Sequence, residues 1–261
     1  MRLTVLGSGS PRPDPLRSQP AALLEIGGEH VLVDCGDGTM RRLVEAGVDA
    51  ASVTRVVLTH LHWDHVLGLP AFAWGSWGLG RPRLEVWGPV GTADLLRTTL
   101  QAPFAEQASW VAQLGWDPAG WDDVVVHEIG DGATVDVGGG RLTFGRVHHP
   151  PIEAYGVRAE HDGAVVTVSG DTTACDELVA LARDADLLLM DACAPAPGHP
   201  LAGFHATPAD AGGVAARAGV ARLVLTHLLP ETDPRHVAAE AGGRFAGVVG
   251  AAGDLDAYDV P

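Results

Sequence analysis

Two kinds of apolar segment alternate along the chain, with glycine and proline between them. Short β-branched and aliphatic runs are typical of strands, and longer Ala/Leu/Val stretches are typical of helices. The pattern predicts strands at Arg2–Leu6, His30–Val33, Arg55–Leu58, Leu84–Trp87, Val124–Ile129, Arg141–Val147, Tyr155–Ala159, Ala164–Ser169, Leu187–Met190 and Arg222–Leu225. It predicts helices at Gly38–Ala46, Gly91–Leu100, Cys175–Ala182, Pro208–Ala218 and Asp233–Ala241. This alternation indicates an α/β fold, in which helices cover β-sheets.

Two pairs of segments echo each other along the chain. Thr54–Leu61 and Ala221–Leu228 both read as an arginine, a short apolar strand and then Thr-His-Leu. More weakly, His30–Asp37 and Val165–Asp171 are both apolar strands that end in a Gly-Asp turn. We interpret the chain as two similar halves whose strand ends meet at one edge, where α/β proteins collect functional groups. Three residues are expected at that edge: His60, Asp171 and His227.

The composition allows one large hydrophobic core. Of 261 residues, 46% are apolar, and no linker divides the chain, so we expect a single domain over residues 1–261. No apolar run reaches the roughly 18 residues that a membrane span needs. The N-terminal MRLTVLGSGS indicates a first strand and not a signal peptide. We therefore expect a cytoplasmic protein without a membrane partner.

Acidic residues outnumber basic ones 33 to 17, which gives a net charge of −16. A protein that binds a long phosphate backbone usually carries a basic stripe, and no Lys/Arg cluster is visible here. The balance therefore favours a small-molecule substrate over a long nucleic acid. The cysteines Cys35, Cys175 and Cys193 form no CxxC pair, so we expect them to be small buried thiols.

The strongest chemical signal is His60-Leu-His62-Trp-Asp64-His65, which follows a predicted strand. His-x-His allows two imidazoles to converge on one metal ion, and Asp64 and His65 can hold a second ion at the next turn. A carboxylate from the other half, Asp171, is suited to bridge the two ions. This pattern predicts a dinuclear metal centre. A His/Asp shell accepts zinc, which we expect, and also manganese or iron.

Other histidines also fall at predicted loops or strand ends. They are His148, His149, His205 and His227. Among the acidic residues, Asp34 and Asp37 lie in the turn Asp34-Cys-Gly-Asp37-Gly, after the strand His30–Val33.

The chain resembles the metallo-β-lactamase superfamily, and within it the ribonuclease Z-like branch, which includes small phosphodiesterases. The matching stretches run through nearly the whole chain: Leu6–Ser10, Val33–Thr39, Leu58–Pro70, His149 with Tyr155–Gly156, Ser169–Thr172, His205–Thr207 and Leu225–Leu228. The resemblance implies an αββα sandwich, in which two mixed sheets pack face to face with helices outside. Members of the branch are often dimers, so it also leaves a homodimer open.

The resemblance assigns roles to individual residues. It implies one metal ion held by His60, His62 and His149, a second held by Asp64, His65 and His227, and Asp171 as the bridge. His205 matches a histidine beside the metals that assists the departing oxygen or the transition-state charge. A buried, hydrogen-bonded structural histidine is the alternative for His205. The candidate catalytic residues are Asp64 and His205.

Two interpretations remain open for the metal-binding histidine after Val147, for Asp34 and for Asp37. His149 fits the metal pattern better than His148, because it follows Val147 by two places and precedes a proline. Asp34 either fixes the tautomer of a ligand histidine or only shapes its turn. For Asp37 the turn is the favoured explanation.

Several functions fit such a centre. The leading hypothesis is a phosphodiesterase for a small cyclic nucleotide or cyclic phosphate, in which a hydroxide bridging the metals is the nucleophile. A lactone, ester or amide hydrolase is the alternative. Transfer-RNA 3′ processing ranks lower, because only 21 residues separate His149 from Asp171 and leave no room for the long arm that binds transfer RNA. A non-catalytic metal-binding protein ranks last.

Tryptophans are concentrated around the metal motif and after it. We expect Trp63 and one of Trp74 or Trp77 to line the mouth of the site and bind an apolar or planar group. Core packing is the alternative for each. The segment rich in Gly and Pro that follows holds three more: Trp110, Trp116 and Trp121.

Overall fold

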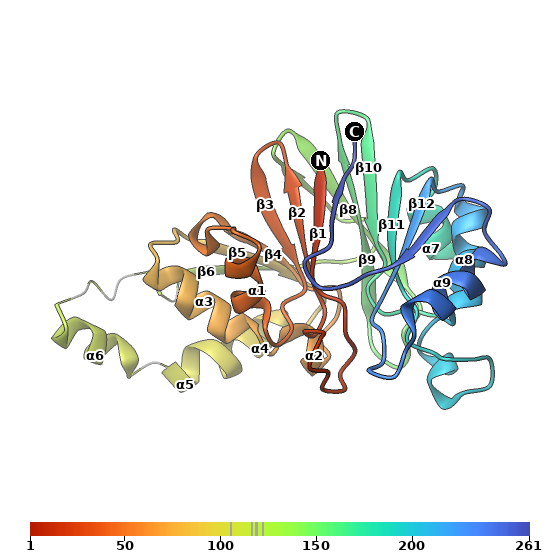
Figure 1. Cartoon of the computed structure of the whole chain (residues 1–261). Coiled ribbons are helices and arrows are strands. Elements are labelled where there is room, and N and C mark those ends of the chain that lie inside the picture. The colour runs from red at the N-terminus through yellow and green to blue at the C-terminus, as the bar shows by residue number, and fades with distance from the viewer. Residues whose placement is uncertain (105, 116, 118–119, 122) are drawn as a thin grey trace.

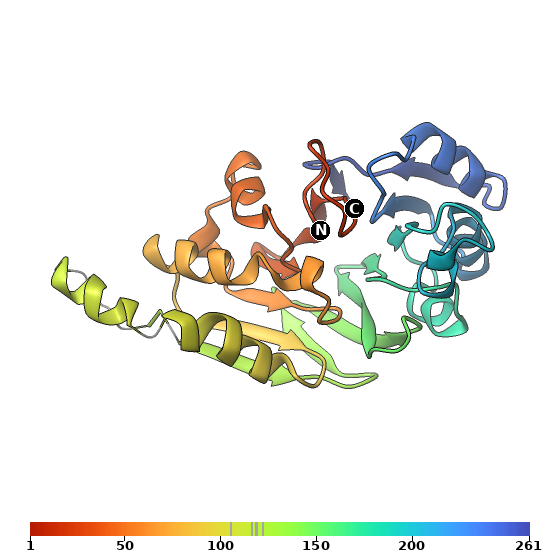
Figure 2. The same ribbon diagram turned by 90° about the horizontal axis from the view of Figure 1, so that it is seen from below.

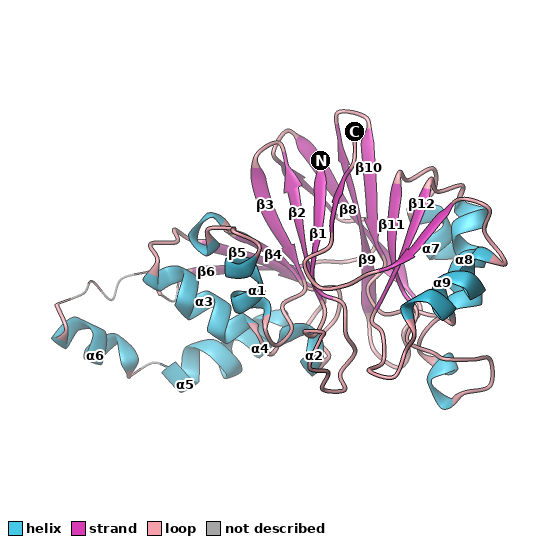
Figure 3. Cartoon of the chain, viewed as in Figure 1, coloured by secondary structure: helices cyan, strands magenta, loops and turns pink. Residues whose placement is uncertain are grey.

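The strands form two sheets that pack face to face (Figures 1 and 3). The computed structural model describes residues 1–104, 106–115, 117, 120–121 and 123–261, so Trp116 lies outside the described residues. In the described ranges each sheet has seven strands, and helices lie on the outer face of each sheet (Figure 1). The predicted αββα sandwich of two mixed sheets is therefore confirmed.

The strand order of the first sheet is β14-β1-β2-β3-β4-β5-β6. Its pairs are antiparallel from β14 to β3 and parallel from β3 to β6. The bounds are β14 (Ala257–Asp259), β1 (Arg2–Gly7), β2 (Ala21–Ile26), β3 (Glu29–Val33), β4 (Arg55–Val57), β5 (Leu84–Gly88) and β6 (Val124–Glu128).

The second sheet repeats this plan with the order β13-β12-β11-β10-β9-β8-β7. Its pairs are antiparallel from β7 to β10 and parallel from β10 to β13. The bounds are β7 (Thr134–Val137), β8 (Gly140–Val147), β9 (Ala154–His161), β10 (Ala164–Val168), β11 (Leu187–Asp191), β12 (Arg222–Thr226) and β13 (Val248–Ala251).

The topology corrects one of the two sequence echoes. Counted from the antiparallel end of each sheet, β3 corresponds to β10, which agrees with the weaker echo between their Gly-Asp turns. By the same count β4 corresponds to β11, not to β12 as the stronger echo suggested. Strands β4 and β12 look alike for a local reason. Each is a parallel strand with neighbours on both sides, and each leads to a buried histidine.

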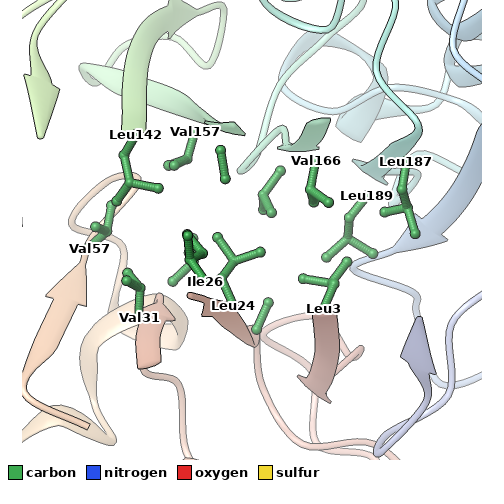
Figure 4. Close-up of a cluster of buried hydrophobic side chains, with 14 of the residues drawn as sticks. Leu3, Leu24, Ile26, Val31, Val57, Leu142, Val157, Val166, Leu187 and Leu189 are labelled. Atoms are coloured by element: carbon green, nitrogen blue, oxygen red, sulfur yellow. The ribbon is translucent and has the colours of Figure 1, made fainter. Parts of the chain in front are cut away.

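Three apolar clusters hold the layers together. The first lies between the sheets and joins side chains such as Leu24, Leu142 and Leu189 from both of them (Figure 4). The other two lie under the outer helices of the first and second sheets. The helices over the first sheet are α1 (Thr39–Glu45), α3 (Leu69–Gly78) and α4 (Thr92–Leu96), and those over the second are α7 (Asp176–Leu181), α8 (Pro208–Ala218) and α9 (Pro234–Gly242).

All ten predicted strands and all five predicted helices are present, with ends shifted by a few residues. The sequence pattern missed β2, whose Ala-Ala-Leu-Leu-Glu-Ile consists mostly of good helix formers. Pairing with β1 and β3 overrides that preference. The short strands β7, β13 and β14 at the sheet edges were also missed. So were four helices: α2 (Trp63–Val66), α3, α5 (Ala102–Phe104) and α6 (Gln107–Gln113).

The carboxyl ends of β3, β4, β10, β11 and β12 meet at one edge of the sandwich. Helix α2 lies at this edge, between the two sheets, and the chain ends lie at the opposite edge (Figure 1). At the edge that holds α2, a β-bridge between Gly9 and Leu228 joins the two halves. None of the helices in the described ranges combines the length and hydrophobicity of a membrane span.

Helix α8 offers a test of the local sequence signal. Thr207 is its N-cap and forms a capping box with Asp210, since each side chain accepts a hydrogen bond from the other residue's backbone N–H. We expect Thr207→Ala to lower the free energy of unfolding by about 1 kcal/mol, whereas Thr207→Ser keeps the cap. Urea unfolding at equal metal content measures both variants. Equal losses in the two would show that the cap hydroxyl does not stabilise the helix.

Candidate metal centre

The segment that follows β4 brings four polar side chains to the edge between the sheets. His60 is fully buried, and His62 is half-buried at the N-cap of α2. Asp64 and His65 lie within α2, and both are buried. Gly36 packs against the backbone oxygen of Asp64 so closely that a Cβ atom would collide with it. The Val33–Thr39 turn and the metal motif are therefore packed together.

A first group of possible metal ligands combines the motif with residues from the second sheet. It consists of His60, His62, His149 and Asp171, whose ligand atoms all lie within 4.8 Å of one another. His149 follows β8, and its Nε2 lies 3.1 Å from Nδ1 of His62. Asp171 follows β10. Both sheets thus contribute to this group.

A second group lies beside the first. The ligand atoms of Asp64, His65 and His227 also lie within 4.8 Å of one another. His227 follows β12, with Nε2 3.3 Å from Oδ2 of Asp64. Its φ of 62° is in the left-handed region, which is uncommon outside glycine. Such strain often occurs at functional positions.

The carboxylate of Asp171 lies between the two groups. Its Oδ2 is 3.6 Å from Nε2 of His60 and 3.4 Å from Nε2 of His227. Its Oδ1 is 3.2 Å from Nε2 of His65. One carboxylate therefore faces histidines of both groups, as a bridging ligand would.

The donor atoms fit metal ions. Nε2 of His60 and Nε2 of His65 are buried and make no hydrogen bond to any described residue. Buried polar atoms rarely lack a partner unless an ion or water supplies one. Their Nδ1 atoms, in contrast, both have partners: the hydroxyl of Thr59 at 3.0 Å from His60 and the carboxylate of Asp34 at 2.8 Å from His65. The free Nε2 atoms are thus the ones that face the centre.

Residues around the two groups fix the orientation of the imidazoles. Asp34 accepts hydrogen bonds from His65 Nδ1 and from the backbone N–H and hydroxyl of Thr59. His149 Nδ1 donates to the backbone oxygen of Phe204 at 2.8 Å. A proton on Nδ1 leaves the lone pair on Nε2 free for a metal ion. Of the two interpretations of Asp34, the geometry agrees with the tautomer-fixing one.

His205 lies beside the two groups and pairs with a residue that the sequence pattern missed. Its Nδ1 is 2.8 Å from Oδ2 of Asp191. Asp191 also accepts hydrogen bonds from the backbone N–H groups of Thr172 and Cys193. The His205 ring lies 5.0 Å from the ring of His149 and 5.1 Å from that of His227, between centroids.

Asp191 could have been found from the sequence. It directly follows the apolar run Leu187–Met190, as Asp34 directly follows His30–Val33. Both acidic residues end a buried parallel strand, and both pair with Nδ1 of a histidine at the centre. Thr59, in contrast, gave no signal apart from its place before His60.

Burial and mutual charge shift the pKa values of these groups in opposite directions. Burial and the neighbouring His65 lower the pKa of His60 well below its usual value. Burial also disfavours charge on His65, but Asp171 and Asp34 outweigh it and raise that pKa to about 10. Burial likewise opposes charge on Asp171, yet His227 and His65 hold its pKa well below its usual range. Metal ions would have to displace the protons that balance these carboxylates.

The remaining candidates lie outside the two groups. His148 is exposed and bonds through Nδ1 with the hydroxyl of Thr173 at 2.9 Å. Asp37 is exposed in its turn, beside Gln19. Trp63 is 51% exposed at the start of α2.

Trp74, Trp77, Trp110 and Trp121 do not share this position. Trp74 stacks on Trp121 with 4.9 Å between ring centroids and meets Trp77 and Phe104 edge to face. This cluster on α3 agrees with the packing alternative. Trp110 on α6 is 58% exposed, and α6 projects away from the sandwich (Figures 1 and 2).

Comparisons with known proteins agree with this geometry. The profile of the beta-lactamase superfamily domain matches residues 29–228. A ribonuclease Z of Mycobacterium bovis is 34% identical over 276 positions, covering 100% of this chain and 98% of that protein. A ribonuclease Z of Mycobacterium marinum is 36% identical and covers 94% of this chain and 95% of that protein.

Solved structures give the same picture. The metallo-β-lactamase fold protein YhfI of Bacillus subtilis has a TM-score of 0.80 at 23% identity and covers 98% of both chains. The short form of human tRNase Z has a TM-score of 0.75 at 27% identity and covers 100% of both. Since the family profile covers most of the chain and the curated relatives match it from end to end, this protein belongs to the metallo-β-lactamase superfamily and is a metal-dependent hydrolase.

Proposed function

We propose that the protein is a phosphodiesterase of the ribonuclease Z type, which uses two metal ions to cleave a phosphodiester in RNA. The observation that carries the proposal is the arrangement around Asp171. Two groups of ligands share this carboxylate, and a His205–Asp191 pair lies beside them. Centres with two ions suit attack at phosphorus.

The charges favour two ions over one. Four carboxylates are buried at the centre: Asp34, Asp64, Asp171 and Asp191. Their partners are imidazoles, backbone N–H groups and a threonine hydroxyl. With neutral imidazoles, two divalent cations would balance four negative charges, and buried charges need such compensation.

Residues of both groups would hold these ions. His60, His62 and His149 would bind one, Asp64, His65 and His227 the other, and Asp171 would bridge them. Bound ions lower the pKa of water and stabilise negative charge on the attacked group. The histidine-rich donor set suits zinc, and manganese or iron also fit it.

His205 is suited to deliver a proton to the departing oxygen. Burial disfavours its charged form, but the Asp191 carboxylate outweighs this and raises the pKa of His205. Asp191 holds Nδ1, which leaves Nε2 for the substrate. An imidazole held in this way can act as a general acid near neutral pH.

The curated relatives favour RNA over a small cyclic phosphodiester, which reverses the order expected from the sequence. The short segment between His149 and Asp171 is not evidence against an RNA substrate. The Mycobacterium bovis ribonuclease Z aligns over 276 positions with the 261 residues of this chain. It therefore has room for only about 15 additional residues within the matched span.

Local charge supports RNA as well. A cleft of about 280 Å³ is lined by Arg12, Arg17, Arg41, Arg42, Asp14 and Asp37. Three of these arginines pair with Glu231, Glu45 and Asp254, whereas Arg17 donates only to uncharged oxygens and keeps its charge for a ligand. It adjoins the centre, since Gln19 in its wall packs against Gly36, which in turn packs against Asp64. A phosphate chain could bind here despite the net charge of −16.

A small cyclic phosphodiester is the second candidate substrate. The acidic balance of the whole chain favours it, because long-range repulsion opposes a long polyanion.

Metal analysis tests the ligand assignment. We expect the purified wild type to hold about two ions per chain. His149→Ala should lose about one of them, because it removes one of only a few protein ligands to the first ion. The adjacent His148→Ala is a matched control and should keep both. Mass spectrometry of the metals after dialysis measures this, and loss in His148→Ala alone would reverse the assignment.

The proton-transfer role predicts a specific kinetic pattern. His205→Ala should lower kcat by about 10²- to 10⁴-fold with metal content unchanged, and Asp191→Asn should lower kcat less without changing KM. The distant His161→Ala serves as a control. The assay substrate is a precursor RNA, whose departing ribose oxygen needs a proton. Bis-p-nitrophenyl phosphate should lose much less activity, because p-nitrophenolate leaves without one. An unchanged kcat in His205→Ala would eliminate this role.

Substrate choice is tested with a precursor transfer RNA carrying a 3′ trailer, 2′,3′-cyclic nucleotides and an acyl lactone. We expect cleavage of the precursor, lost in Asp64→Ala. Arg41→Ala in the arginine cleft should raise KM for RNA several-fold and leave bis-p-nitrophenyl phosphate unaffected, whereas the exposed Arg97→Ala should change neither. Turnover of cyclic nucleotides alone would favour the second candidate, and turnover of the lactone alone would refute both.

A further inference from the structure

A second cavity adjoins the metal centre on the side of the second sheet. Its volume is about 720 Å³, within the range of small-molecule sites. Its walls are the loop of residues 192–204, the segment 229–233 and the start of α9. Both loops follow the carboxyl ends of strands, β11 and β12 (Figures 1 and 2). The cavity therefore lies at the same edge as the possible metal ligands.

The cavity and the centre share one wall. Cys193 lies in that wall, and its sulfur lies within 4.8 Å of ligand nitrogens of His205 and His227. At its other end the same loop provides the Phe204 oxygen that accepts a hydrogen bond from His149. A group bound in the cavity would therefore be separated from His205 and His227 only by Cys193 and would lie against the loop that contacts His149.

The lining has an apolar floor and a polar rim. Ala192, Leu229 and Val237 are buried at the floor. The rim carries one arginine and three carboxylates, and Arg12 is already paired with Glu231 at 2.5 Å. Of the other two carboxylates, Asp233 accepts a hydrogen bond from the Arg235 backbone N–H, and Glu240 lies 3.9 Å from Nε2 of His236. The rim still has more carboxylates than arginines. A phosphate would be repelled here, whereas a flat neutral group with N–H donors at its edge would suit both floor and rim.

We propose that this cavity binds the nucleobase next to the cleaved phosphodiester, with preference for a base that has an exocyclic amino group. The inference rests on the proposed phosphodiesterase function and adds a binding site to it. In this arrangement the arginine cleft binds phosphates of the substrate, and the cavity binds one of its bases. An acyl chain would suit the apolar floor as well but would make no hydrogen bond to the carboxylates of the rim.

Three chromogenic esters isolate the contribution of the base. The p-nitrophenyl esters of adenosine 5′-phosphate, uridine 5′-phosphate and ribose 5-phosphate release the same leaving group. We expect kcat/KM for the adenosine ester to exceed that for the ribose ester by about tenfold, with the uridine ester between them. Equal values for all three would overturn the proposal.

A cavity-filling variant tests the location. Leu201 lines the cavity and is half-buried. Leu201→Trp should raise KM for the adenosine ester about tenfold and leave kcat/KM for the ribose ester within about twofold. Leu79→Trp places the same side chain at a position that is 59% exposed beyond α3 and should change neither. Equal effects of Leu201→Trp on both esters would refute the location.

Binding to the metal-free protein separates this inference from the proposed function. Saturation-transfer NMR should detect adenosine but not ribose with the wild type, and should lose the adenosine signal in Leu201→Trp. Adenosine binding without turnover of any ester would support the cavity and refute the phosphodiesterase. Turnover without adenosine binding, or binding of an octanoyl lactone in place of adenosine, would refute base binding in the cavity. It would not contradict the phosphodiesterase function.

Discussion

The carboxylate of Asp171 is buried among imidazoles that come from both sheets. It lies 3.2 to 3.9 Å from nitrogens of His60, His65, His149, His205 and His227. A charge in such a place is stable only while opposite charge surrounds it. The sheets must therefore pack in one register, because β4, α2, β8 and β12 each deliver a histidine to the same carboxylate. The apolar core between the sheets keeps this register, and the metal centre depends on it.

The same device orients histidines in both halves. Asp34 at the end of β3 pairs with His65, and Asp191 at the end of β11 pairs with His205. In each case a carboxylate at the end of a strand fixes Nδ1 of the ring, and in His65 the Nε2 atom then faces Asp171. The outcomes differ, because His65 faces Asp171 among the ligand groups, whereas His205 lies beside them. One strand-end arrangement thus suits both metal binding and proton transfer.

Charge separates the surroundings of the centre into two regions. Arginines line the cleft on the side of the first sheet, and an acidic rim with an apolar floor surrounds the cavity on the side of the second. A substrate with a phosphate chain at one end and a base at the other matches this polarity. The net charge of −16 hides it, because a sum over the sequence loses the positions of the charges.

The sequence by itself determined most of the strands, most of the covering helices and most of the histidines and aspartates of the centre, because apolar periodicity and metal-ligand spacing are local properties. It also favoured His149 over His148, and the structure places His149 in the first group of possible metal ligands. Only the tertiary structure decided what depends on contacts between distant segments. Pairing with β1 and β3 made β2 a strand, Asp191 met His205 only after folding, and the topology matched β4 with β11. The cavity beside Cys193 has no local signal, since its walls come from three separate segments.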